Sequence, residues 1–130
     1  MSYKVLIVDD SHFMRSMIRE IFASEGFDVA GEAADGEEAV RLYQELRPDL
    51  TTMDIVMSKM DGITALKEIL ALDPQAKVIM ISYLGQEPLI AEAIEAGARD
   101  FIVKPFQRSR VLKVARYVLG LDEGPKGAEG

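Results

Sequence analysis

The sequence contains no cysteine and only one histidine among its 130 residues. Without cysteine the chain can form neither a disulfide framework nor a thiolate metal site, and this composition is compatible with the cytoplasm. The single histidine, His12, makes no metal site alone, and its place near an expected helix start indicates a helix-surface residue. Disulfide-stabilised scaffolds and metal sites of cysteine or histidine are thereby excluded.

Long apolar runs and an excess of positive charge are also missing. No run approaches the length of a membrane span, and residues 1–4 lead directly into an expected strand without a signal-peptide region. The formal net charge at pH 7 is −7, and an acidic balance repels phosphate backbones. We therefore expect a cytoplasmic protein that binds neither membranes nor nucleic acids directly.

The composition that is present is typical of one globular domain. Hydrophobic residues make up 48% of the chain and charged residues 28%, which is an ordinary balance for a folded protein. A chain of this length can bury a core large enough to fold alone. We expect the domain to span residues 1–120 and the segment 121–130, which lacks apolar periodicity, to form a flexible C-terminal tail.

Apolar segments of strand length alternate with segments of helical periodicity. The expected strands are residues 5–8, 28–33, 50–53, 78–81 and 101–103. After the first of them, apolar residues recur at helical spacing, namely Phe13, Met14, Met17, Ile18, Ile21 and Phe22. This alternation predicts an α/β fold, a doubly wound five-stranded parallel sheet with helices on both faces. The weak second strand suits a sheet edge.

Four of the five expected strands run into a charged or hydroxyl side chain. Asp9 and Asp10 follow the first strand and Asp54 the third, while Ser82 follows the fourth and Lys104 the fifth. An aspartate after a strand is commonly only a turn or cap residue. However, the carboxyl ends of parallel strands share one edge of the sheet, where ligands bind. The joint placement therefore predicts one functional pocket.

The residue types in this pocket indicate phosphoryl chemistry with a divalent cation. Clustered carboxylates disfavour one another's ionisation unless a cation is present, and oxygen ligands of this kind suit Mg²⁺. A carboxylate beside such an ion can act as a nucleophile toward phosphorus. Lys104 would neutralise the transferred group, and the Ser82 hydroxyl could donate a hydrogen bond to one of its oxygens.

Residues 3–119 resemble the receiver domain of two-component response regulators. The motifs that carry the resemblance are Val5-Leu6-Ile7-Val8-Asp9-Asp10, Met53-Asp54-Ile55-Val56-Met57, Met60-Asp61-Gly62, Ala96-Gly97-Ala98 and Lys104-Pro105-Phe106. The sequences Thr52-Met53-Asp54 and 101–107 most resemble those of stand-alone chemotaxis regulators of the CheY type. The resemblance implies the flavodoxin-like strand order 2-1-3-4-5, for which CheY is a standard example.

The resemblance also implies a role for each residue of the pocket. Asp54 would accept a phosphoryl group from a histidine kinase, so the chain would be a phosphoacceptor that assists its own phosphorylation and dephosphorylation, and not an enzyme. Asp9, Asp10, Asp54 and the backbone carbonyl of Val56 would bind Mg²⁺. Ser82 would bind phosphoryl oxygens together with Lys104.

Two further implications concern the response to phosphorylation. Ser82 and Phe101 would act as the switch, with the aromatic ring changing rotamer, and the bond between Lys104 and Pro105 would be cis. The altered surface would then bind a downstream target, such as a flagellar motor switch protein, and a phosphatase is a further possible partner.

Four positions bear on how long the phosphoryl group would last. Ser58 stands where the family usually has a proline. Without that restraint the loop should be looser, at a cost of roughly 0.4–1 kcal/mol in the free energy of folding. Tyr83 stands where a small residue is common, either as a plain surface aromatic or as a lid over the pocket. Val56 and Leu84 are apolar and cannot orient an attacking water, so we expect slow self-dephosphorylation.

Other functions are compatible with parts of the pattern. A phosphorelay shuttle or a phosphate sink would use the same residues, as would a receiver-like module that is never phosphorylated. A phosphatase of the haloacid-dehalogenase class would need an Asp-x-Asp pattern after the first strand, where this chain has Asp9-Asp10. A flavodoxin-like electron carrier would need a phosphate-binding loop at that place, where the two carboxylates would repel the phosphate.

Overall fold

The computed structural model describes residues 2–122. Most of the segment 121–130, for which a flexible tail is predicted, therefore lies outside the described residues. The elements, in chain order, are β1 (Lys4–Val8), α1 (His12–Ala23), β2 (Asp28–Ala33), α2 (Gly36–Leu46), β3 (Leu50–Asp54), α3 (Gly62–Leu72), β4 (Val78–Tyr83), α4 (Glu87–Ala96), β5 (Asp100–Lys104) and α5 (Arg108–Val118). Within these residues no helix is long and apolar enough to cross a membrane.

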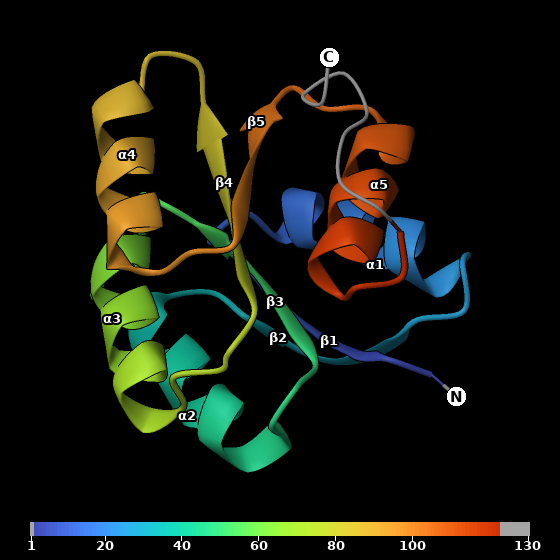
Figure 1. Cartoon of the computed structure of the whole chain (residues 1–130), viewed down its shortest axis with the longest axis horizontal. Helices are drawn as coiled ribbons and strands as arrows, with labels where there is room; N and C mark the ends of the chain where they lie inside the picture. Colours follow the sequence, from blue (N-terminus) through green and yellow to red (C-terminus); the bar gives the residue numbers. More distant parts are fainter. Residues whose placement is uncertain (1, 123–130) are drawn as a thin grey trace.

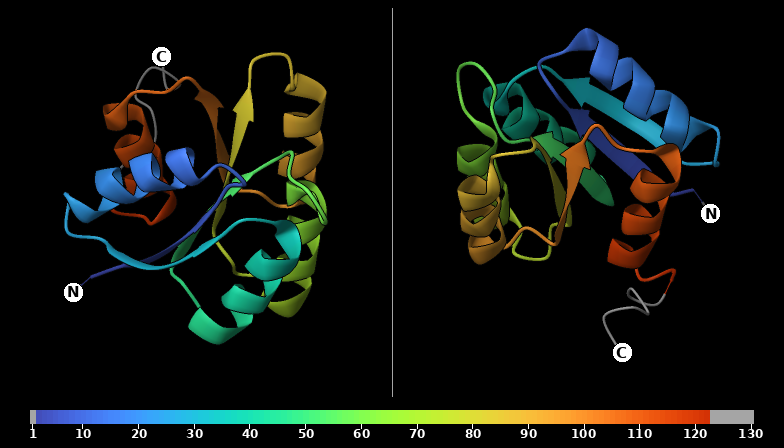
Figure 2. Two further views of the ribbon diagram at one scale, coloured as in Figure 1. Left: turned by 180° about the vertical axis from the view of Figure 1, so that it is seen from behind. Right: turned by 90° about the horizontal axis from the view of Figure 1, so that it is seen from above.

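The five strands form one parallel sheet in the order β2-β1-β3-β4-β5 (Figure 1). The predicted fold class and strand order are thereby confirmed, and β2 lies at the edge as its weak pattern indicated. Helices α1 and α5 cover one face of the sheet, and α2, α3 and α4 cover the other, as the additional views in Figure 2 also show.

The sheet separates two apolar layers because successive side chains of a strand point to opposite faces. Leu6 and Val8 of β1 pack with α2, α3 and α4, whereas Val5 and Ile7 pack with α1 and α5. All four side chains are at most 1% exposed. A continuous apolar run of this kind is what a strand covered on both faces requires.

The apolar stripe of α1 is narrower than its sequence predicts. Ile18, Ile21 and Phe22 are buried against the sheet, but Phe13 is 70% exposed and Met17 is 36% exposed. With 3.6 residues per turn, positions 13 and 17 lie one above the other on the flank of the helix, away from the sheet-facing row. The predicted helix is confirmed, but only part of its apolar residues face the sheet.

Candidate functional site

The carboxyl edge of the sheet brings four strand-end side chains into one pocket. Asp9, Asp54, Ser82 and Lys104 are each at most 5% exposed, whereas Asp10 is exposed. One carboxylate oxygen from each of the three aspartates lies within 4.8 Å of the others. Residues separated by up to 95 positions in the chain therefore form one buried polar cluster with an opening at Asp10.

Lys104 is the ammonium group inside this cluster. Its Nζ donates a hydrogen bond to Asp9 Oδ2 at 3.0 Å and lies 3.7 Å from Asp54 Oδ2. Burial acts to lower the pKa of Lys104, but the hydrogen bond to Asp9 and the charges of Asp54 and Asp9 outweigh it, so the pKa is raised above its ordinary value. The lysine therefore stays charged and links the two buried carboxylates.

The carboxyl group of Asp54 has a raised pKa. Burial is the main cause that raises its pKa from the ordinary 3.8 to about 6, and the negative charge of Asp9 adds to it. Lys104 acts in the opposite direction but does not compensate, and Asp10 raises the pKa further. One ammonium is too little positive charge for three carboxylates, so a divalent cation would be favourable here.

The Asp9 peptide is fixed by contacts that the sequence did not indicate. The backbone N–H of Ser11 donates to Asp9 Oδ1 at 2.9 Å, and Arg15 Nη1 donates to the Asp9 backbone oxygen at 2.7 Å. Arg15 is held in turn by Glu32 of β2, with Nε and Oε1 3.2 Å apart. No sequence motif indicated that Arg15 contacts Asp9, because this contact depends on β2 lying beside α1.

Ser82 presents a hydroxyl without a protein partner. Its Oγ is fully buried and makes no hydrogen bond to any described residue. A buried hydroxyl left unpaired is unfavourable, typically by about 1–3 kcal/mol. Ser82 lies near the end of β4, one residue after Ile81, which pairs with Asp54 of β3.

The loop between β3 and α3 is anchored at both of its ends. The Gly62 N–H donates to the Ile55 backbone oxygen at 2.7 Å, and the Gly36 N–H of α2 donates to the Met60 oxygen at 3.0 Å. A Cβ atom on Gly62 would overlap the backbone oxygen of Asp54. Glycine at this position lets α3 begin directly against the end of β3, which fixes the backbone on both sides of the carboxylate.

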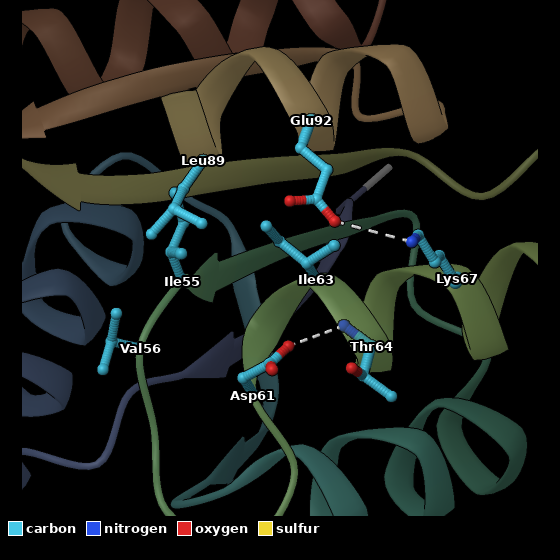
Figure 3. A pocket seen from close by; sticks show the side chains of 8 residues that line it. All are labelled: Ile55, Val56, Asp61, Ile63, Thr64, Lys67, Leu89 and Glu92. Atoms are coloured by element: carbon cyan, nitrogen blue, oxygen red, sulfur yellow. Dashed lines mark hydrogen bonds and ion pairs between the residues drawn. The ribbon is translucent and has the colours of Figure 1, made fainter. Parts of the chain in front are cut away.

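An apolar groove lies between the β3–α3 loop, α3 and α4 (Figure 3). Its volume is about 280 Å³, and it is lined by Ile55, Val56, Asp61, Ile63, Thr64, Lys67, Leu89 and Glu92. The polar groups at its rim satisfy one another: Lys67 and Glu92 are 3.6 Å apart, and Asp61 caps α3 by accepting from the Thr64 N–H. The carboxylate cluster of Asp9, Asp10 and Asp54 does not contribute to the lining of this groove.

Other residues singled out from the sequence surround the pocket. Val56 is 55% exposed and Leu84 is 75% exposed, so both side chains border the solvent. Phe101 of β5 is half-buried and packs against the layer under α3 and α4. The peptide bond between Lys104 and Pro105 is cis.

Comparison with known proteins assigns the family. The family model of the response regulator receiver domain matches residues 5–116. The chain therefore belongs to this family. It is 55% identical to the chemotaxis protein CheY of Thermotoga maritima over 118 residues, which cover 91% of this chain and 98% of that protein. It is also 55% identical to the chemotaxis protein CheY of Bacillus subtilis, covering 92% of this chain and 99% of that one.

Solved structures agree with this assignment. The crystal structure of the CheX-CheY-BeF3-Mg²⁺ complex from Borrelia burgdorferi contains a chain 49% identical to this one, with a TM-score of 0.86. The match covers 89% of this chain and 88% of that chain. The similarity thus extends over nearly the whole length of a stand-alone receiver.

Proposed function

We propose that this chain is a cytoplasmic chemotaxis response regulator that accepts a phosphoryl group on Asp54 from a histidine kinase. The observation that carries the proposal is the buried cluster of Asp54, Asp9 and Lys104, with one carboxylate of raised pKa and one ammonium 3.7 Å from it. The similarity to CheY proteins from end to end supports the chemotactic role.

Each residue of the cluster has a distinct task in this proposal. Asp54 supplies the oxygen that bonds to phosphorus. Lys104 lies on the side of Asp54 where its ammonium can pair with the new negative charge, and the unpartnered Ser82 hydroxyl can donate to a phosphoryl oxygen. Asp54 and Lys104 already lie beside each other before the reaction, so the pair needs little reorganisation.

The carboxylates fit a divalent cation. Asp9, Asp10 and Asp54 offer oxygen ligands close to one another, and the Val56 backbone carbonyl would complete the protein's share of the ligands. Mg²⁺, when bound, supplies positive charge for the phosphoryl oxygens. Asp9 is prepared for this task because Ser11 and Arg15 fix its side chain and its backbone.

The phosphorylated state would be recognised through a switch that starts at Ser82. The hydroxyl would move toward the phosphoryl group, and the space it leaves would let Phe101 turn inward. The surface of α4, β5 and α5 would then differ between the two states, and a downstream partner such as a flagellar motor switch protein would bind one of them.

The direct test is incubation of the full chain with Mg²⁺ and acetyl phosphate, followed by intact-mass measurement. We expect one added phosphoryl group in the parent protein and none in Asp54→Ala. Glu95→Ala, which removes an exposed carboxylate of α4, serves as the matched control and should be modified like the parent. Absence of an adduct in the parent protein would refute the proposal.

A second measurement separates a motor-switch ligand from a phosphorelay shuttle or a phosphate sink. Protein loaded with beryllofluoride, as a stable mimic of the phosphoryl group, is used to capture partners, beside unloaded protein. Capture of a motor switch component by the loaded form alone is the expected result. Transfer of the phosphoryl group from Asp54 to a histidine protein, without any such capture, would favour the shuttle or the sink.

A further inference from the structure

Tyr83 lies directly over the ammonium group of the pocket. Lys104 Nζ is 4.8 Å from the centroid of the Tyr83 ring, which is within the range of a cation–π contact. The lysine itself is only 4% exposed, while the tyrosine is 56% exposed. One face of the ring therefore covers the cation and the rest of the side chain meets the solvent.

The contact between the Tyr83 ring and Lys104 follows from the strand register. Tyr83 is the last residue of β4, and Lys104 is the residue opposite it in β5. Register partners of neighbouring parallel strands project their side chains from the same face of the sheet, so these two side chains lie next to each other. The Tyr83 N–H also donates to Gln86 Oε1 at 2.8 Å, which ties the backbone to the turn before α4.

The covered cation is the one that pairs with Asp54. Lys104 Nζ has the carboxylates of Asp9 and Asp54 on one side and the aromatic ring on another. Removal of the ring would expose the ammonium to water and release one of the contacts that restrain it. Both effects act on the place where a phosphoryl group on Asp54 would lie.

We propose that Tyr83 is an aromatic lid that holds Lys104 toward Asp54 and restricts the approach of water, so that the phosphorylated state lasts longer. This inference rests on the proposed function, and Tyr83 acts in it as a positioning residue. In the hydrolysis that the lid slows, a water oxygen bonds to phosphorus and the bond from phosphorus to the Asp54 oxygen breaks. The electron pair stays on the carboxylate, and dihydrogen phosphate carries away both hydrogens of the water.

The experiment follows the loss of the phosphoryl group after removal of the donor. The full chain and its variants are phosphorylated with acetyl phosphate and Mg²⁺, the donor is removed by gel filtration, and the modified fraction is measured over time by intact mass. Tyr83→Ala should lose the group about two- to five-fold faster, the range expected from a partly exposed cation–π contact. Tyr83→Phe keeps the ring and should match the parent.

Two further variants separate the lid from general effects. Tyr117→Ala removes an aromatic residue that is 42% exposed on α5, and it should decay like the parent. Tyr83→Leu keeps apolar bulk without an aromatic face and should also decay faster than Tyr83→Phe. Unfolding temperatures of all variants, measured in parallel, identify any loss of fold.

The outcomes are distinct. An unchanged or slower decay in Tyr83→Ala would overturn the lid, and so would a decay in Tyr83→Phe as fast as in Tyr83→Ala. If the parent protein accepts no phosphoryl group, the proposed function fails first and the lid fails with it. If all variants are modified at Asp54 and decay alike, only the lid is refuted.

Discussion

At the scale of single residues, the pocket combines three acids with one ammonium. Lys104 is shared between Asp9 and Asp54, at 3.0 Å and 3.7 Å. The nearer partner is Asp9, so Asp54 is only partly compensated and its pKa rises to about 6 through burial and the neighbouring negative charge. This imbalance keeps the candidate acceptor in need of a further cation.

The raised pKa of Asp54 predicts how stability depends on pH in metal-free buffer. The folded-state pKa lies above the unfolded value, so the contribution of Asp54 to stability is fully present below about pH 4 and is lost as the pH rises through about 6. Asp54→Asn has no such loss. The variant should therefore gain roughly 1–3 kcal/mol over the parent between about pH 4 and pH 7.

Urea unfolding of both proteins across this pH range, with chelator present, measures the effect. The difference between the two free energies of unfolding isolates Asp54 from other titrating groups that the proteins share. A difference that stays constant from acid to neutral pH would contradict the assignment.

The apolar side chains beside the pocket predict slow self-dephosphorylation. Val56 and Leu84 are exposed but cannot hydrogen-bond to an attacking water. Val56→Asn places an amide at this position and should speed the decay of the phosphorylated protein, whereas Val56→Leu should leave it unchanged. Decay of the labelled parent protein measures the absolute rate, and loss within seconds would disprove the prediction.

At the scale of elements, the β3–α3 loop is held by the start of one neighbouring helix, α2. The Gly36 N–H of α2 binds the Met60 carbonyl, and Lys59 pairs with Asp35, with Nζ and Oδ2 3.7 Å apart. Asp35 also caps α2 by accepting from the Glu38 N–H. A loop without the usual proline at Ser58 is thus attached to the start of α2.

Gly36→Ala should destabilise this attachment. A Cβ atom would overlap the carbonyl of Met60, which is backbone and cannot rotate away. We expect a loss of about 1–3 kcal/mol in the free energy of unfolding, as for other overpacked sites. Gly31→Ala is the control, because its Cβ would meet only side-chain ends, with Leu46 Cδ1 the nearest at 2.7 Å. An equal loss in both variants would rule out the backbone overlap as the cause.

At the scale of the whole molecule, the sheet places negative charge at one edge of a chain whose net charge is already −7. Folding brings the Asp54 carboxylate close to those of Asp9 and Asp10, from which it is 44 or more positions away in the chain. A divalent cation that binds this arrangement stabilises the folded state alone. The stabilisation is about 2.7 kcal/mol when free Mg²⁺ exceeds Kd about 100-fold.

Mg²⁺ should therefore raise the unfolding temperature by several degrees, and chelation should reverse the shift. Asp10→Asn should lose most of the effect, because its carboxylate is the exposed member of the cluster. Glu95→Gln removes the same charge from the surface of α4 and should retain the shift. Scanning calorimetry with and without Mg²⁺ makes the comparison, and an equal shift in both variants would place the cation elsewhere.

The sequence by itself determined the fold class and the membership of the pocket. Apolar runs alternating with helical stripes are local signals, and they sufficed to predict a parallel sheet with helices on both faces. In such a sheet the ends of strands meet, so Asp9, Asp54 and Lys104 could be assigned to one site without coordinates.

Only the tertiary structure decided how the members of the pocket are paired. That Lys104 binds Asp9 more closely than Asp54, that Arg15 holds the Asp9 backbone, and that Tyr83 covers the ammonium all depend on strand register and on packing between distant segments. Helical periodicity likewise did not indicate that Phe13 is exposed, because spacing alone does not say which side of a stripe meets the sheet. Local patterns determine which residues reach an edge, whereas long-range packing determines which of them touch.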